Sequence, residues 1–144
     1  MILCDQRLNV LSSSRRVNET AEDIDLEIIE FASWFEITAL PTNWRLDRLK
    51  RVLELVEFVD STHFDLEALG KEATEHLRQV MHCLLLFSKK LPKEAYIGTG
   101  QNAAKSILKV GLRSSDAEIQ QSAVRARDNL LLAGRFEFME LDSF

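Results

Sequence analysis

Apolar residues recur at helical spacing along most of the chain, and the strongest pattern covers residues 65–91. Its apolar positions are separated by steps of three and four residues, which is typical of a helix in a bundle or a coiled-coil pair. They are Leu66, Leu69, Ala73, Leu77, Val80, Leu84, Phe87 and Leu91. This seam also makes the 66–91 helix a candidate for homo-oligomer formation. Because Gly70 weakens the first turns, two shorter helices are the alternative.

Two helices are predicted before this segment, on either side of Pro41. Residues 20–40 carry one apolar stripe, and the alternation that would indicate a strand breaks at Ile29. After Pro41, Thr42 or Asn43 is predicted to cap a helix that ends near residues 60–62. The residues predicted to face inward on that helix are Leu46, Leu49, Val52, Leu53, Val56 and Val59.

Two shorter helices are predicted after Pro92, and Gly134 is predicted to end the last one. Their inward residues are Ala104, Ile107, Leu108 and Gly111 on the first, and Ile119, Ala123, Ala126, Leu130 and Ala133 on the second. The predicted fold class is therefore all-α, a helical bundle of about five helices in a single domain over residues 18–144. Residues 1–17 lack a sustained period and are predicted to form a flexible N-terminal arm. The aromatic-rich residues 136–141 are expected to pack on the domain, because exposing them is unfavourable.

Residues 102–133 resemble a HEAT or armadillo-type helix pair. The stretch AAKSILKVGL leads through a short turn into SSDAEIQQSAVRARDNLL, with an acidic residue after the turn and small or aliphatic residues at the packing positions. Those positions are Asp116, Ile119, Ala123, Ala126 and Leu130. The resemblance implies a C-terminal helical hairpin that stacks on its neighbours. No Asp-Pro turn and no second copy at a period of roughly 33 to 47 residues accompanies it, so a capping repeat, a fragment of a larger helical protein and an ordinary hairpin stay open.

Charge is distributed unevenly along the chain. The composition is that of a soluble globular domain, with 46% apolar and 28% charged residues, and the formal net charge is −5, which gives no global attraction to nucleic acid or to an anionic membrane. Residues 18–41 hold seven acidic residues and no lysine or arginine. On a helix, Glu27 and Glu30 share a face with Trp34, and such a face suits a basic protein partner. The other interpretation is a solvated face whose Trp34 packs on a neighbouring helix.

A milder basic run, Lys105, Lys109 and Arg113, is a candidate anion patch. Contact with single-stranded nucleic acid usually requires aromatic rings beside the charges, and Tyr96 is the one aromatic residue close by in the sequence. Nucleic-acid binding is therefore disfavoured, and an ordinary solvated face is the alternative.

Arg78 and His82 resemble the Arg-to-His arrangement of helical HEPN ribonucleases, in which a cation and an imidazole cleave RNA without a metal. Three residues lie between them, a shorter interval than that family uses. The step of four places both side chains near one helical face, so an exposed pair without chemistry explains them equally.

Other stretches that resemble chemical motifs lack a required residue or a required spacing. Residues 98–106 resemble a phosphate-binding loop, but Ala104 stands where a glycine must precede Lys105, so a structural turn and no cofactor are expected. The three histidines do not have metal-ligand spacing, and no metal site is expected. Cys4 and Cys83 match no disulfide or zinc pattern and are interpreted as free thiols in a reducing compartment. Burial is expected to raise the pKa of Cys83 and make it unreactive.

These observations predict a cytoplasmic, non-catalytic protein–protein interaction or adaptor module that binds a basic partner through its acidic helix. No apolar run is long enough to span a membrane, and no signal peptide is recognised at the start. The alternative is a HEPN-like helical ribonuclease or RNA-binding protein that uses Arg78 and His82.

Overall fold

The computed structural model describes residues 40–56, 66–92, 100–133 and 138. Within these ranges the fold is all-helical, as predicted, and contains five helices. They are α3 (Thr42–Leu55), α4 (Leu66–Lys71), α5 (Leu77–Lys90), α6 (Gly100–Leu112) and α7 (Ala117–Leu132). The predicted arm over residues 1–17 and the predicted helix over residues 20–40 lie outside the described residues.

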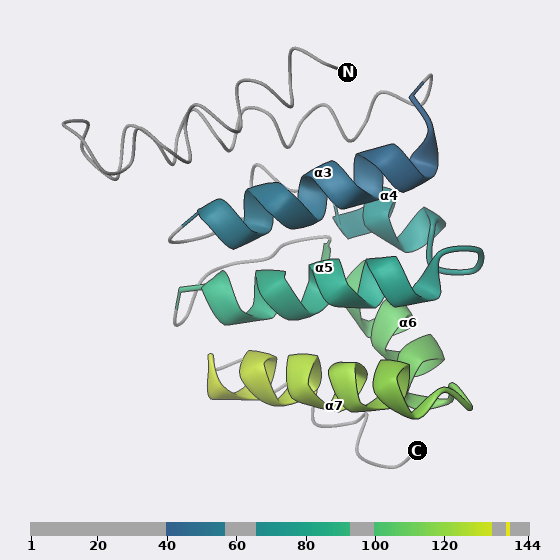
Figure 1. Cartoon of the computed structure of the whole chain (residues 1–144). Coiled ribbons are helices and arrows are strands. Elements are labelled where there is room, and N and C mark those ends of the chain that lie inside the picture. Colours follow the sequence, from purple (N-terminus) through teal and green to yellow (C-terminus); the bar gives the residue numbers. More distant parts are fainter. Residues whose placement is uncertain (1–39, 57–65, 93–99, 134–137, 139–144) are drawn as a thin grey trace, which may run out of the picture.

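The helices form two layers (Figure 1). In one layer α5 packs between α3 and α7, and all three begin at the same end of the stack. In the other layer α4 packs against α6, which also contacts α5 and α7. Helices that follow one another in the sequence therefore alternate between the layers. The starts of α3, α5 and α7, at residues 42, 77 and 117, lie 35 and 40 residues apart.

The prediction of a single helix over residues 65–91 is wrong, and the alternative of two shorter helices is confirmed. α4 ends at Lys71, directly after Gly70, and α5 begins at Leu77 after a short turn. A glycine lowers helix propensity, and the break lets Leu66 and Leu69 pack in a different layer from Val80 and the residues that follow it.

The apolar seam of residues 65–91 is buried inside a single chain. Seven of its eight side chains are buried, and the eighth, Leu77, is half-buried. Burial of apolar surface is the main stabilising term in folding, so these residues form the core and not a contact between copies. The interpretation of residues 66–91 as a homo-oligomer seam is therefore corrected.

α3 contributes the predicted core residues but has different ends. Leu46, Leu49, Val52, Leu53 and Val56 are buried, while Val59 lies outside the described residues. The N-cap is Pro41 and not Thr42 or Asn43, and the helix ends at Leu55, earlier than predicted. At its C-terminal end Lys90 of α5 donates from Nζ to the carbonyl oxygens of Glu54 (3.3 Å) and Val56 (2.6 Å). A lysine from the neighbouring helix therefore satisfies carbonyls that the helix itself leaves unpaired.

A buried arginine joins α3 to the turn between α4 and α5. Arg45 is 6% exposed and donates from Nη2 to Glu72 Oε1 at 3.2 Å and to Thr42 Oγ1 at 3.1 Å. Its Nε donates to the carbonyl of Leu40 at 3.1 Å. Because a buried charge is tolerated only when it is paired and hydrogen-bonded, this arrangement fixes the position of the turn relative to α3.

Two glycines let α6 approach its neighbours closely. A Cβ on Gly100 would lie 2.8 Å from Leu66 Cδ1, and a Cβ on Gly111 would lie 2.9 Å from Ala123 Cβ and overlap the Met81 side chain. Gly111, predicted to face inward, is thus the point at which α5, α6 and α7 meet.

α7 begins at an N-cap that satisfies its first amides. The Asp116 carboxylate accepts hydrogen bonds from the backbone N–H groups of Glu118 (2.9 Å) and Ile119 (3.3 Å). Beyond α7, Phe138 is fully buried in the core. The expected packing of the C-terminal tail is therefore confirmed at this residue.

Two glycine substitutions should have opposite effects on stability. Gly111→Ala should lower the free energy of unfolding by about 1–3 kcal/mol, because the new methyl group collides with Ala123. Gly70→Ala should raise it by about 0.5–1 kcal/mol, because its Cβ would lie at an ordinary 3.7 Å from Ala103 Cβ and alanine favours the helix. Urea denaturation followed by circular dichroism measures both, and a shift of the two midpoints in the same direction would contradict the packing described.

Candidate functional site

Arg78, the candidate catalytic cation, forms ion pairs with two carboxylates at the start of α7, the helix that packs beside α5 in the same layer. It lies at the start of α5, and its Nη1 donates to Glu118 Oε2 while its Nη2 donates to Asp116 Oδ2. The hydrogen bond to Glu118 and the negative charges of Asp116 and Glu118 raise the pKa of the guanidinium. Since Asp116 also caps α7, the two ion pairs connect the start of α5 to the start of α7.

His82 lies one turn after Arg78 on α5 and is half-buried. The helix therefore places the two residues on neighbouring turns, as their spacing predicted. A guanidinium that already neutralises two carboxylates is poorly suited to stabilise a reacting phosphate, because that phosphate would have to displace them. The arrangement favours a structural role for Arg78.

Cys83 is fully buried in the middle of α5. Its Sγ lies 3.7 Å from the carbonyl oxygen of Leu46, and burial raises the pKa of the thiol to about 12. The thiolate is the reactive form, so this cysteine is inert at neutral pH, as the sequence predicted. Among the described residues, three or more His, Cys, Asp or Glu side chains nowhere gather as a metal site would require.

The predicted anion patch lies along α6 and just past its end. Lys109 and Arg113 are exposed and Lys105 is half-buried, at intervals of four residues that place them along one side of the helix. Lys105 and Arg113 also interact with other groups of the chain. The predicted contact residues Glu27, Glu30 and Trp34 lie outside the described residues, so the acidic face stays a prediction.

A groove lies between α4 and α6 beside this patch. Its volume is about 510 Å³, and it is lined by Glu67, Gly70, Lys71, Asn102, Ala103 and Ser106. Sequence reasoning missed this groove, because it exists only once α4 separates from α5 and packs on α6.

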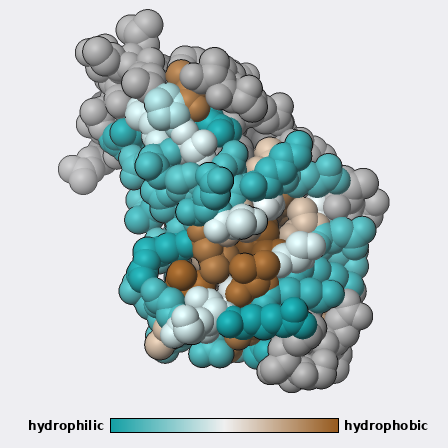
Figure 2. Space-filling model, turned by 90° about the vertical axis from the view of Figure 1, so that its right-hand side faces the viewer, coloured by the Kyte–Doolittle hydropathy of each residue, from teal (hydrophilic) through white to brown (hydrophobic). Residues whose placement is uncertain are grey.

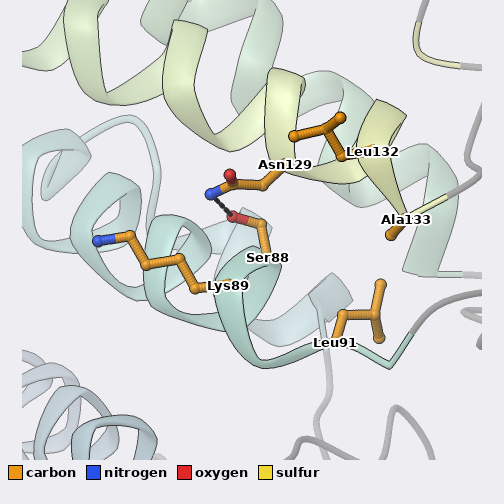
Figure 3. A pocket seen from close by; sticks show the side chains of 6 residues that line it. All are labelled: Ser88, Lys89, Leu91, Asn129, Leu132 and Ala133. Atoms are coloured by element: carbon orange, nitrogen blue, oxygen red, sulfur yellow. Dashed lines mark hydrogen bonds between the residues drawn. The ribbon is translucent and has the colours of Figure 1, made fainter.

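A second hollow, of about 310 Å³, lies where α5 and α7 end (Figure 3). Asn129 Nδ2 donates to Ser88 Oγ at 3.1 Å, and Ser88 donates in turn to the carbonyl of Leu85 at 2.7 Å. These polar groups hydrogen-bond within the wall of the hollow, so their contacts join α5 to α7. Leu91, Leu132 and Ala133 form its apolar lining, and Leu132 is 79% exposed.

The opposite end of the stack carries apolar surface. Figure 2 shows hydrophobic atoms gathered in the middle of the face at which α3, α5 and α7 begin, with hydrophilic residues around them. Leu77, Leu112 and Ile119 lie at this end of their helices and keep partial exposure. An apolar area with a polar border is typical of a protein contact surface.

Comparisons with protein-family models, with curated proteins and with solved structures find no match to this chain. Each helix in the described ranges is too short or too polar to span a membrane.

Cys83 should be protected from thiol reagents in the folded protein. In a Cys4→Ser background, a disulfide reagent at about pH 8 should leave the Cys83 thiol unmodified until urea unfolds the chain, because burial raises its pKa from 9.0 to about 12. Because burial raises the pKa of the thiol, Cys83 leaves the free energy of unfolding unchanged below pH 9.0 and lowers it as the pH rises toward about 12. Fast labelling of the native protein at rates typical of an exposed thiol would contradict the burial of this residue.

Proposed function

We propose that this protein is a non-catalytic protein-interaction module built as a stack of helices. The observation that carries the proposal is the engagement of Arg78, the cation of the Arg78–His82 pair, by Asp116 and Glu118, which supports a structural role for this arginine. The inert Cys83 and the internally bonded Ser88 and Asn129 support the same conclusion. Arg78, Ser88 and Asn129 make contacts between helices, and the surfaces of the helices are proposed to serve binding.

The two-layer arrangement supports the resemblance of residues 102–133 to a HEAT-type helix pair. α6 and α7 lie in different layers and pack against each other, and each also packs on a preceding helix of its own layer. Stacked helix pairs of this kind expose long surfaces that suit extended partners. The buried, unpaired Cys83 thiol supports a reducing compartment and hence the cytoplasm.

A basic protein partner for the acidic face around Glu27, Glu30 and Trp34 remains part of the proposal. Its support is the charge of residues 18–41, with seven acidic residues and no lysine or arginine. A charge excess of this size raises the rate at which an oppositely charged partner associates.

The ribonuclease alternative is tested by a single-turnover RNA cleavage assay. Wild type and His82→Ala should show the same background cleavage, because Arg78 is committed to its two carboxylates. His76→Ala is the matched control, since it removes a half-buried histidine at the start of the same helix. Cleavage that is lost in His82→Ala and kept in His76→Ala would establish the ribonuclease and overturn the module.

Affinity capture from the source lysate tests the module directly. We expect a protein partner that survives nuclease treatment and whose recovery falls between low and moderate salt, because charge contributes to the contact. Recovery that disappears after nuclease treatment would assign the protein to RNA binding instead. Mass spectrometry of the treated and untreated arms reads out both outcomes.

A further inference from the structure

The solvent-facing side of α6 carries basic, neutral polar and apolar residues. Its exposed residues are Asn102, Ser106, Lys109 and Val110, with Arg113 just beyond the helix end. They recur at intervals of four, three, one and three residues, so they form one continuous stripe. α6 contains no acidic residue, a property that it shares with α5, whereas α3, α4 and α7 each contain at least one. We call this surface the α6 stripe.

An apolar side chain lies in the middle of the α6 stripe. Val110 is 47% exposed and is one of the two large hydrophobic residues classed as exposed among the described residues. Lys109 is its direct neighbour. A partner that places an apolar side chain on Val110 and a carboxylate beside it on Lys109 would gain both apolar burial and a charge-assisted contact.

The other half of the α6 stripe forms one wall of the groove between α4 and α6. Asn102 and Ser106 of α6 line it together with Glu67, Gly70 and Lys71 of α4. The amide of an asparagine both donates and accepts, which matches the N–H and C=O groups of a peptide backbone. From residue 102 to residue 113 the stripe is roughly 16 Å long, the length of about five residues of extended chain.

We propose that the α6 stripe binds an extended acidic segment of a protein partner. The segment's backbone lies in the groove against Asn102 and Ser106, and an apolar and an acidic side chain rest on Val110 and Lys109. Lys105 and Arg113 extend the basic character of the same side of the helix. This inference rests on the proposed function, because it names the surface and the chemical class of one partner of the module.

The groove favours a peptide over a nucleic acid. Glu67 of α4 also lines the groove and would repel a uniform chain of phosphates, whereas a peptide can place a neutral residue there. Neither α4 nor α6 contains an aromatic residue, so the stripe offers no ring on which a base can stack.

Fluorescence anisotropy on the full chain tests the proposal. The probe is a labelled peptide of about 12 residues, longer than the stripe, with Asp or Glu at two of every three positions and Leu at the third. At about 50 mM salt, Lys109→Glu should weaken binding about tenfold. Val110→Ser should weaken it about threefold with no change in charge. Arg125→Glu, an equal charge reversal at an exposed position of α7, is the matched control and should change affinity by less than about twofold.

Several outcomes would overturn the proposal. These are an absence of peptide binding, an equal effect of Lys109→Glu and Arg125→Glu, and binding of an oligouridylate of the same length as tightly as the peptide. A lysine-for-acid version of the peptide that binds equally well would also overturn it. If peptide binding fails while wild type and Lys109→Glu capture the same nuclease-resistant partner, the module stands and this inference falls. If neither experiment finds a protein ligand, both fall.

Discussion

The break between α4 and α5 is the constraint on which the two-layer arrangement depends. A continuous helix from Leu66 to Lys90 would keep its apolar residues on one straight seam and in one layer. Because the chain turns after Gly70, α4 with Leu66 and Leu69 packs on α6, while α5 packs on α3 and α7. The buried Arg45, paired with Glu72, holds this turn against α3. The groove between α4 and α6 is a direct consequence, since it lies between helices that the break allowed to meet.

Polar contacts at both ends set the register of the three helices in the first layer. At one end Arg78 connects the starts of α5 and α7, and at the other Lys90 bonds the last carbonyls of α3. The hydrogen bond from Asn129 to Ser88 adds a second connection between α5 and α7. These contacts are directional, so they add to the interdigitated packing of side chains in limiting how far each helix can slide along its neighbour. The polar side chains of α5 and α7 that make these contacts therefore have a structural role.

The proposed function and the proposed α6 stripe give the two charged regions of the chain two different partners. The acidic residues of segment 18–41 suit a basic protein, and the basic and neutral residues of the α6 stripe suit an acidic peptide. Charge complementarity of this kind contributes specificity and association rate more than raw affinity.

Hydrophobic spacing by itself determined the helical class, the core residues of α3 and α6 and most of those of α7, where Ile119 is the exception with partial exposure. The sequence also indicated the inertness of Cys83 and the packing of Phe138, because both depend on burial of apolar surface. It did not decide where the 65–91 pattern breaks, since Gly70 costs only about 1 kcal/mol and packing against α6 makes the difference. It also did not show that Arg78 belongs to the framework, because its carboxylate partners lie 38 and 40 positions further along the chain. The groove and the α6 stripe likewise depend on which helices become neighbours. Contacts between residues distant in sequence are decided by tertiary packing, and local patterns carry no information about them.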